Sequence, residues 1–153
     1  MTKGQVIEKG YRWYLDAGIG DAYNFNTAQT ISVNNMQCYG MVSTTHGYRY
    51  GCWFVGAGIG YYHSFRDKEN IYPLYLAGRY SLEDVKLRPY METRAGIVFD
   101  PYWISPVQAY GAFGVGLNVY RRFQTGLRIS VFSRPSRYFT ANAAIVFCYE
   151  FGK

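Results

Sequence analysis

The chain has 153 residues, the usual length of one domain, and no linker or shift in composition divides residues 1–153. Aromatic residues make up 20% of the chain and 17 residues are glycine, a mixture typical of pleated strands. The formal net charge of +6 raises nucleic acid or anionic lipid as partners, but no run of basic residues is longer than Arg121-Arg122. We therefore expect a single all-β domain that does not bind nucleic acid.

Metal-binding and redox residues are few and scattered. Three cysteines, Cys38, Cys52 and Cys148, lack the paired spacing of a disulfide framework or a zinc site, so we expect each to be a small buried strand residue. The two histidines, His46 and His63, stand far apart with no neighbouring ligand pattern. We expect no metal and no other cofactor.

Apolar and polar residues alternate in segments of about ten residues, which predicts β-strands. In the first segment Trp13 and Leu15 share one face, while Arg12 and Asp16 share the other. Pro73, within the fourth segment, is compatible only with a strand start or a bulge. In chain order, the predicted segments are 11–20, 30–44, 52–62, 71–80, 87–98, 112–119, 126–131 and 139–151.

The connections between these segments alternate in character. Residues 20–29, 63–70, 99–106 and 133–137 are mostly polar, acidic or proline-bearing, and shorter turns are predicted at His46-Gly47, Glu83-Asp84 and Arg121-Arg122. Long loops at one end and short turns at the other are typical of outer-membrane barrels, whose short turns face the periplasm. We therefore predict an antiparallel, up-and-down, eight-stranded transmembrane β-barrel with both termini on the periplasmic side.

The placement of charge indicates which strand face points into the barrel. A strand face in contact with water normally carries many Lys and Glu, but every lysine here falls at a strand end, a loop or a terminus: Lys3, Lys9, Lys68, Lys86 and Lys153. Charges within strands are limited to Arg12, Asp16, Arg79, Glu92, Arg94, Arg128 and Glu150. Because buried arginines pair well with carboxylates, we predict that these seven residues form an interior charge network. In so narrow a barrel, such a network closes the interior and does not line an ion path.

Two other function classes share parts of this pattern. A soluble lipocalin-like carrier of a small apolar ligand has the same alternation with the opposite face inside. A lipid-modifying enzyme of the outer membrane needs Ser and His on a shared face, and His63 with Ser64 or Ser130 is the available combination. Because nothing in the spacing selects that combination, we expect no catalysis.

One predicted loop carries a cluster of large apolar side chains beside a proline. The cluster consists of Tyr102, Trp103 and Ile104. Such a cluster is either a contact surface for an extracellular partner or glycan, or an anchor at the membrane interface.

Several motifs resemble the small outer-membrane β-barrel proteins of Bacteroides-type Gram-negative bacteria. They are Ser-Thr-Thr-His-Gly-Tyr-Arg-Tyr at 43–50, Trp-Phe-Val-Gly-Ala-Gly-Ile-Gly-Tyr at 53–61, and shorter pieces at 10–18, 71–75, 79–80, 88–90 and 94–96. The resemblance covers most of the chain and implies a barrel of OmpX-like shape without defined chemistry. It also implies export to the bacterial outer membrane with a cleaved signal peptide absent from this chain. We expect a monomer that contacts outer-membrane lipid.

Overall fold

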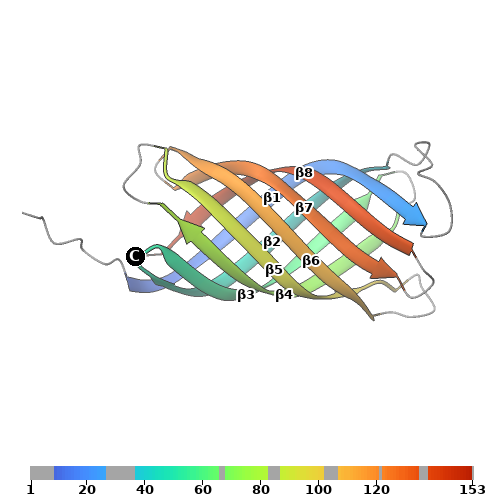
Figure 1. The fold of residues 1–153 in the computed structure, drawn as a ribbon, viewed down its shortest axis with the longest axis horizontal. Coiled ribbons are helices and arrows are strands. Elements are labelled where there is room, and N and C mark those ends of the chain that lie inside the picture. The colour runs from blue at the N-terminus through green and yellow to red at the C-terminus, as the bar shows by residue number, and fades with distance from the viewer. Residues whose placement is uncertain are drawn as a thin grey trace, which may run out of the picture.

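The chain folds into a closed antiparallel β-barrel (Figure 1). The structure is a computed structural model that describes residues 9–26, 37–65, 68–82, 87–101, 107–120, 122–134 and 138–152. The strands in these ranges are β1 (Lys9–Asn26), β2 (Gln37–Tyr50), β3 (Trp53–Ser64), β4 (Asn70–Ser81), β5 (Pro89–Phe99), β6 (Val107–Tyr120), β7 (Phe123–Arg134) and β8 (Tyr138–Phe151). Each strand pairs with the next, and β8 pairs with β1, which confirms the predicted eight-stranded barrel. Among the described residues, no helix is long and apolar enough to cross a membrane.

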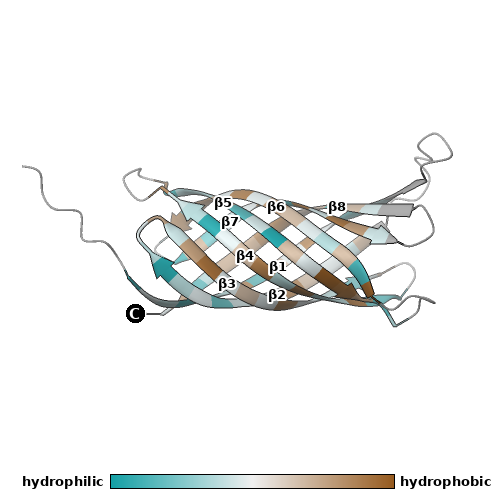
Figure 2. Ribbon diagram, turned by 60° about the horizontal axis from the view of Figure 1, so that its bottom comes forward, coloured by the Kyte–Doolittle hydropathy of each residue, from teal (hydrophilic) through white to brown (hydrophobic). Residues whose placement is uncertain are grey.

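Hydrophobic and hydrophilic residues alternate along the strands (Figure 2), and buried residues alternate with exposed ones, as in β4 and β5. On the outside, Leu76 is 69% exposed, Val55 67% and Leu127 60%. On the inside, Asp16 and Arg79 are buried almost completely. A polar interior within an apolar outer surface is the arrangement of membrane barrels and the reverse of a soluble barrel.

Most strands extend beyond the segments that alternation predicts. Strand β1 continues past Gly20 to Asn26 because β8 supplies ladder partners along this stretch, from Ala144 opposite Gly20 to Tyr138 opposite Asn26. These partners override the polar, loop-like composition of residues 20–26. Residues 30–36, predicted to begin the second strand, lie outside the described residues, as do the predicted turn at 83–84 and residue 121.

The predicted turn at His46-Gly47 is wrong. Strand β2 continues through these residues to Tyr50, and the chain turns at Gly51, whose φ of 58° favours glycine. Gly47 has a different role, because a Cβ atom built on it would lie 2.5 Å from the Cα of Gly56 on β3. The glycine that resembles a turn signal therefore permits two strands to approach closely.

Pro73 lies in β4 where the ladder to β3 is interrupted. The register pairs Ile59 with Leu74 and next pairs Tyr62 with Ile71, so Pro73 has no ladder partner on β3. A proline cannot donate a ladder hydrogen bond, and this irregularity near the strand start accommodates it.

The barrel interior is layered along its axis. A small apolar cluster of Tyr14, Phe54 and Cys148 lies toward the end with the chain termini. A larger cluster, which includes Ala22 and Tyr39, lies toward the opposite end, called here the loop end. On β1, Asp16 stands between Tyr14 and Ala22. A layer of buried arginines and carboxylates, called here the charged layer, lies at the level of Asp16.

Candidate functional site in the barrel interior

Glu92, on β5, is the centre of the charged layer. Its Oε2 accepts hydrogen bonds from Arg79 Nε at 3.1 Å and from Arg79 Nη2 at 2.6 Å. Its Oε1 accepts from Arg94 Nε at 2.6 Å and from Arg128 Nη2 at 2.8 Å. All four side chains are at most 3% exposed, so one carboxylate serves as counter-charge for three buried arginines.

Asp16, on β1, is the second carboxylate of this layer. Its Oδ2 accepts a hydrogen bond from Arg94 Nη2 and others from Arg128 Nη2 and Ser43 Oγ, each at 3.1 Å. Arg94 and Arg128 therefore bridge the two carboxylates. The arginine fork makes this possible because its nitrogens lie in a fixed plane and can reach different acceptors.

Aromatic rings complete the surroundings of the buried arginines. The Arg79 guanidinium lies 4.0 Å from the ring centre of Tyr14 and 4.4 Å from that of Tyr90. The Arg94 guanidinium lies 4.4 Å from the ring centre of Tyr75, and its Nη1 donates to the Tyr75 hydroxyl at 2.7 Å. Such contacts stabilise a cation where water is excluded.

A second charged group lies nearer the chain termini. Glu150 Oε1 pairs with Arg12 Nε at 3.2 Å and with Arg49 Nη1 at 3.1 Å. Gln124 joins this group to the central layer, because it accepts a hydrogen bond from Arg79 Nη1 at 2.5 Å and donates one to Glu150 Oε2 at 3.5 Å. The two groups therefore form one connected network.

The structure brings all seven predicted interior residues into this network and adds one that the sequence analysis missed. Arg49 was missed because the turn was predicted at residues 46–47, which placed Arg49 outside the strand. Continuing the alternation of β2 in steps of two from Ser43 would have put Arg49 on the inner face. The network has five arginines and three carboxylates, a net charge of +2: Arg12, Arg49, Arg79, Arg94 and Arg128 with Asp16, Glu92 and Glu150.

This network links strands that are not neighbours in the sheet. Asp16 and Arg94 join β1 to β5, Glu92 and Arg128 join β5 to β7, and Arg79 and Gln124 join β4 to β7. Ladder hydrogen bonds connect only adjacent strands, so these side chains brace the barrel across its interior.

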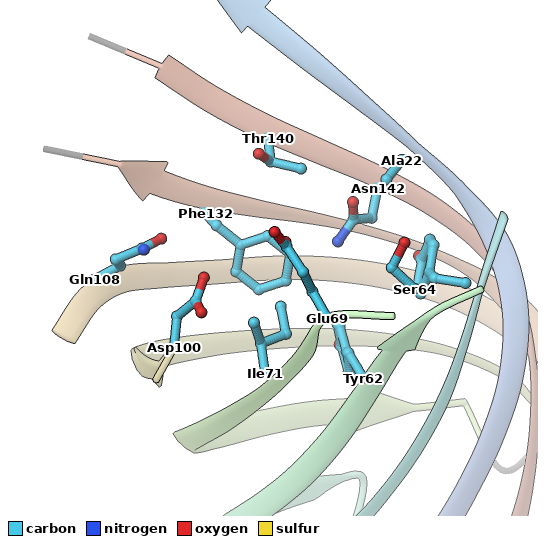
Figure 3. Close-up of a pocket in the computed structure, with 11 residues that line it drawn as sticks. Ala22, Tyr62, Ser64, Glu69, Ile71, Asp100, Gln108, Phe132, Thr140 and Asn142 are labelled. Atoms are coloured by element: carbon cyan, nitrogen blue, oxygen red, sulfur yellow. The ribbon is translucent and has the colours of Figure 1, made fainter. Parts of the chain in front are cut away.

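The combination of His63 with Ser64 or Ser130 is not assembled. The Nδ1 of His63 is hydrogen-bonded to Asn70 Oδ1 at 2.6 Å, and the His63 ring stacks near Tyr61. Ser64 follows His63 on β3 and therefore points to the other side of the sheet, where it lines an interior cavity (Figure 3). Ser130 is buried in the barrel interior on β7.

Other candidate residues are placed as follows. The expectation that each cysteine is buried is wrong, since only Cys148 is buried, whereas Cys38 is exposed and Cys52 lies in the β2–β3 turn. The loop cluster of Tyr102, Trp103 and Ile104 lies outside the described residues. In the described part of the chain, no three His, Cys, Asp or Glu side chains form a group that could hold a metal ion.

Known proteins share this fold but not its sequence. No protein-family model matches the chain, and none of the curated proteins matches it. Neisserial surface protein A (NspA) has a TM-score of 0.58 at 12% identity, over 91% of this chain and 97% of its own. The outer membrane enzyme PagL has a TM-score of 0.68 at 11% identity, over 89% of this chain and 98% of its own.

A third similar structure is Ail, the attachment invasion locus protein of Yersinia pestis, in complex with the heparin analogue sucrose octasulfate. It has a TM-score of 0.55 at 8% identity, over 92% of this chain and 99% of its own. At these identities the likeness shows the fold alone. The fold is therefore that of an eight-stranded barrel resembling small outer-membrane β-barrel proteins.

Proposed function

We propose that this chain is an outer-membrane β-barrel protein of Gram-negative bacteria with a structural or interaction role and a closed interior. In this proposal it is of the Bacteroides type and OmpX-like in shape, and is exported with a cleaved signal peptide. It is a monomer that contacts outer-membrane lipid, and its loops offer a surface to an extracellular partner. It carries out no catalysis and needs no cofactor.

The observation that carries this proposal is the braced interior network within an apolar outer surface. Five buried or nearly buried arginines meet three carboxylates inside the barrel, while side chains such as Leu76 and Val55 face outward. A bilayer offers no hydrogen-bond partners to strand side chains, so polar groups at that depth must face the interior and pair with one another.

The same observation argues against a soluble carrier of an apolar ligand. Such a barrel needs an apolar cavity within and a charged surface outside. Here the middle of the interior contains Glu92, Arg79 and Arg94, and none of them is more than 3% exposed. A ligand without hydrogen-bonding groups would have to displace these ion pairs, which is costly.

Spin labels placed along β8 test the orientation of the barrel. In a background in which the three native cysteines are replaced, single nitroxide labels at Ala143, Ile145 and Phe147 should report high accessibility to lipid-soluble oxygen. Labels at Ala144 and Val146 should report low accessibility, because these residues point inward. The measurement is power-saturation electron paramagnetic resonance in lipid vesicles.

Three results would contradict the proposal. Label accessibility that alternates along β8 with the opposite phase would show a soluble barrel. A purified chain that stays folded and monodisperse without detergent would show the same. Lipid hydrolysis by the protein in micelles, abolished by His63→Ala, would show an enzyme instead.

A further inference from the structure

A partly enclosed cavity lies in the mouth of the barrel at the loop end (Figure 3). Side chains from several strands surround it, among them Phe132 from β7, Tyr62 from β3 and Asn142 from β8. The volume of the cavity is about 50 Å³. One water-sized probe occupies roughly 10–15 Å³, so the cavity admits a few waters or the end of a small ligand.

Four polar groups that line this cavity have no hydrogen-bond partner among the described residues. They are the Tyr39 hydroxyl, Ser64 Oγ, Gln108 Nε2 and Asn142 Oδ1. Tyr39 and Gln108 are each only 4% exposed, and Asn142 is 3% exposed. A buried polar group without a partner destabilises a fold unless bound water or a ligand supplies one, so four such groups around one cavity make it a candidate ligand site.

The chemistry of these groups selects the kind of ligand. Each hydroxyl and each side-chain amide both donates and accepts hydrogen bonds, whichever way the amide is turned. An ammonium could only donate to them, and a phosphate could only accept. Ligand hydroxyl groups do both, as amide groups and water do, so a ligand that carries several hydroxyl groups complements the whole set.

Two further features of the lining fit a ligand rich in hydroxyl groups. The rings of Phe132 and Tyr62 offer an apolar face, and they lie edge to face at 5.7 Å between ring centres. Glu69 and Asp100 also line the cavity and make its wall polar. We propose that this cavity binds the end of a neutral sugar unit, as a free monosaccharide or as the terminal residue of a glycan.

This inference goes beyond the proposed function and does not depend on it. The cavity lies at the loop end, and none of its lining residues belongs to the charge network. Loss of sugar binding would therefore leave the proposal of a closed outer-membrane barrel unaffected.

Nuclear magnetic resonance of the folded protein in micelles tests the inference. The detergent must have no sugar headgroup, and lauryldimethylamine oxide meets this condition. Methyl glycosides of glucose, galactose, mannose and N-acetylglucosamine are titrated to 100 mM while the side-chain amide signals of Gln108 and Asn142 are followed. We expect at least one glycoside to shift both signals saturably, whereas sodium phosphate and tetramethylammonium chloride do not.

Matched variants locate the binding site. Asn142→Leu and Gln108→Leu should each weaken binding about five- to tenfold, because each removes one hydrogen-bonding group of similar size. Thr93→Val, which removes a hydroxyl from the outer face of β5, should leave binding unchanged. Tighter binding of an oligosaccharide than of its terminal methyl glycoside would identify a glycan as the source, and equal binding would identify the free sugar.

Several outcomes would overturn the inference. They are the absence of a saturable shift up to 100 mM glycoside, equal shifts with phosphate or tetramethylammonium, and undiminished binding by both leucine variants. If a leucine variant does not fold, the titration of the unsubstituted protein still tests the inference, because the side-chain amide signals of Gln108 and Asn142 report directly on the cavity.

Discussion

At the scale of single residues, the interior depends on arginine and would not form with lysine. Arg94 uses its Nε toward Glu92 and its other nitrogens toward Asp16 and Tyr75. A lysine has one nitrogen at the end of a flexible chain and could not hold these acceptors in one plane. The guanidinium of Arg79 also lies over two aromatic rings, those of Tyr14 and Tyr90, contacts that suit a flat cation.

Neutralising the central carboxylate should therefore be strongly destabilising. Glu92→Gln keeps the shape of the side chain but leaves three buried arginines with too little counter-charge. We expect a loss of about 3–5 kcal/mol in the free energy of unfolding, measured by urea titration in lipid vesicles.

Two control variants make this result specific. Glu150→Gln is the same chemical change at a side chain that is 12% exposed, and its effect should be smaller because water reaches the site. Ala143→Leu, on the outward-facing side of β8, should be tolerated. If Glu92→Gln and Ala143→Leu had equally small effects, the assignment of inner and outer faces would be wrong.

At the scale of strands, close approach between backbones determines where glycine is needed. A Cβ atom on Gly47 of β2 would lie 2.2 Å from the carbonyl oxygen of Val55, which belongs to the backbone of β3 and cannot move away cheaply. A Cβ atom on Gly111 of β6 would meet nothing within 4 Å. Both glycines lie within strands, but only Gly47 is required by the close approach of a neighbouring backbone.

This contrast predicts that substitution by alanine destabilises the barrel at Gly47 but not at Gly111. Gly47→Ala should destabilise the barrel by about 1–3 kcal/mol, because β2 and β3 must move apart. Gly111→Ala should change stability by no more than about 0.5 kcal/mol. The heat-induced shift of the folded band in semi-native electrophoresis ranks the variants, and equal midpoints would contradict the assignment.

At the scale of the whole molecule, the network makes the interior a braced core. Ion pairs and hydrogen bonds join β1 to β5, β5 to β7 and β4 to β7, so the opposite walls of the barrel are tied together. Narrow barrels have interiors that side chains fill, and here charged side chains fill the middle layer.

A braced core predicts a barrel that does not conduct. The protein reconstituted in planar bilayers at 1 M KCl should show no stepwise conductance, while a porin inserted under the same conditions serves as the positive control. Discrete, salt-dependent steps that appear with the purified protein and persist after a second purification would contradict the closed interior.

The sequence by itself determined the fold class and most of the candidate site. Alternation is a local property of neighbouring residues, so it predicted strands wherever one face was apolar, as in residues 52–62 and 139–151. The absence of lysine from the strand interiors correctly oriented the faces, since Lys9 is only the first residue of β1. Arg12 and Glu92 carry charges that must point inward when the outer surface is apolar.

Only the tertiary structure decided the strand ends, the turn at Gly51 and the membership of Arg49. These features depend on contacts with strands that are distant or separate in sequence. Strand β8 supplies ladder partners to β1 past Gly20, and the backbone of β3 lies close to Gly47. The pairing within the network and the unpaired groups of the loop-end cavity are likewise set by side chains that meet across the barrel. The spacing of residues along the chain does not predict these contacts, because a closed sheet brings together residues that are far apart in sequence.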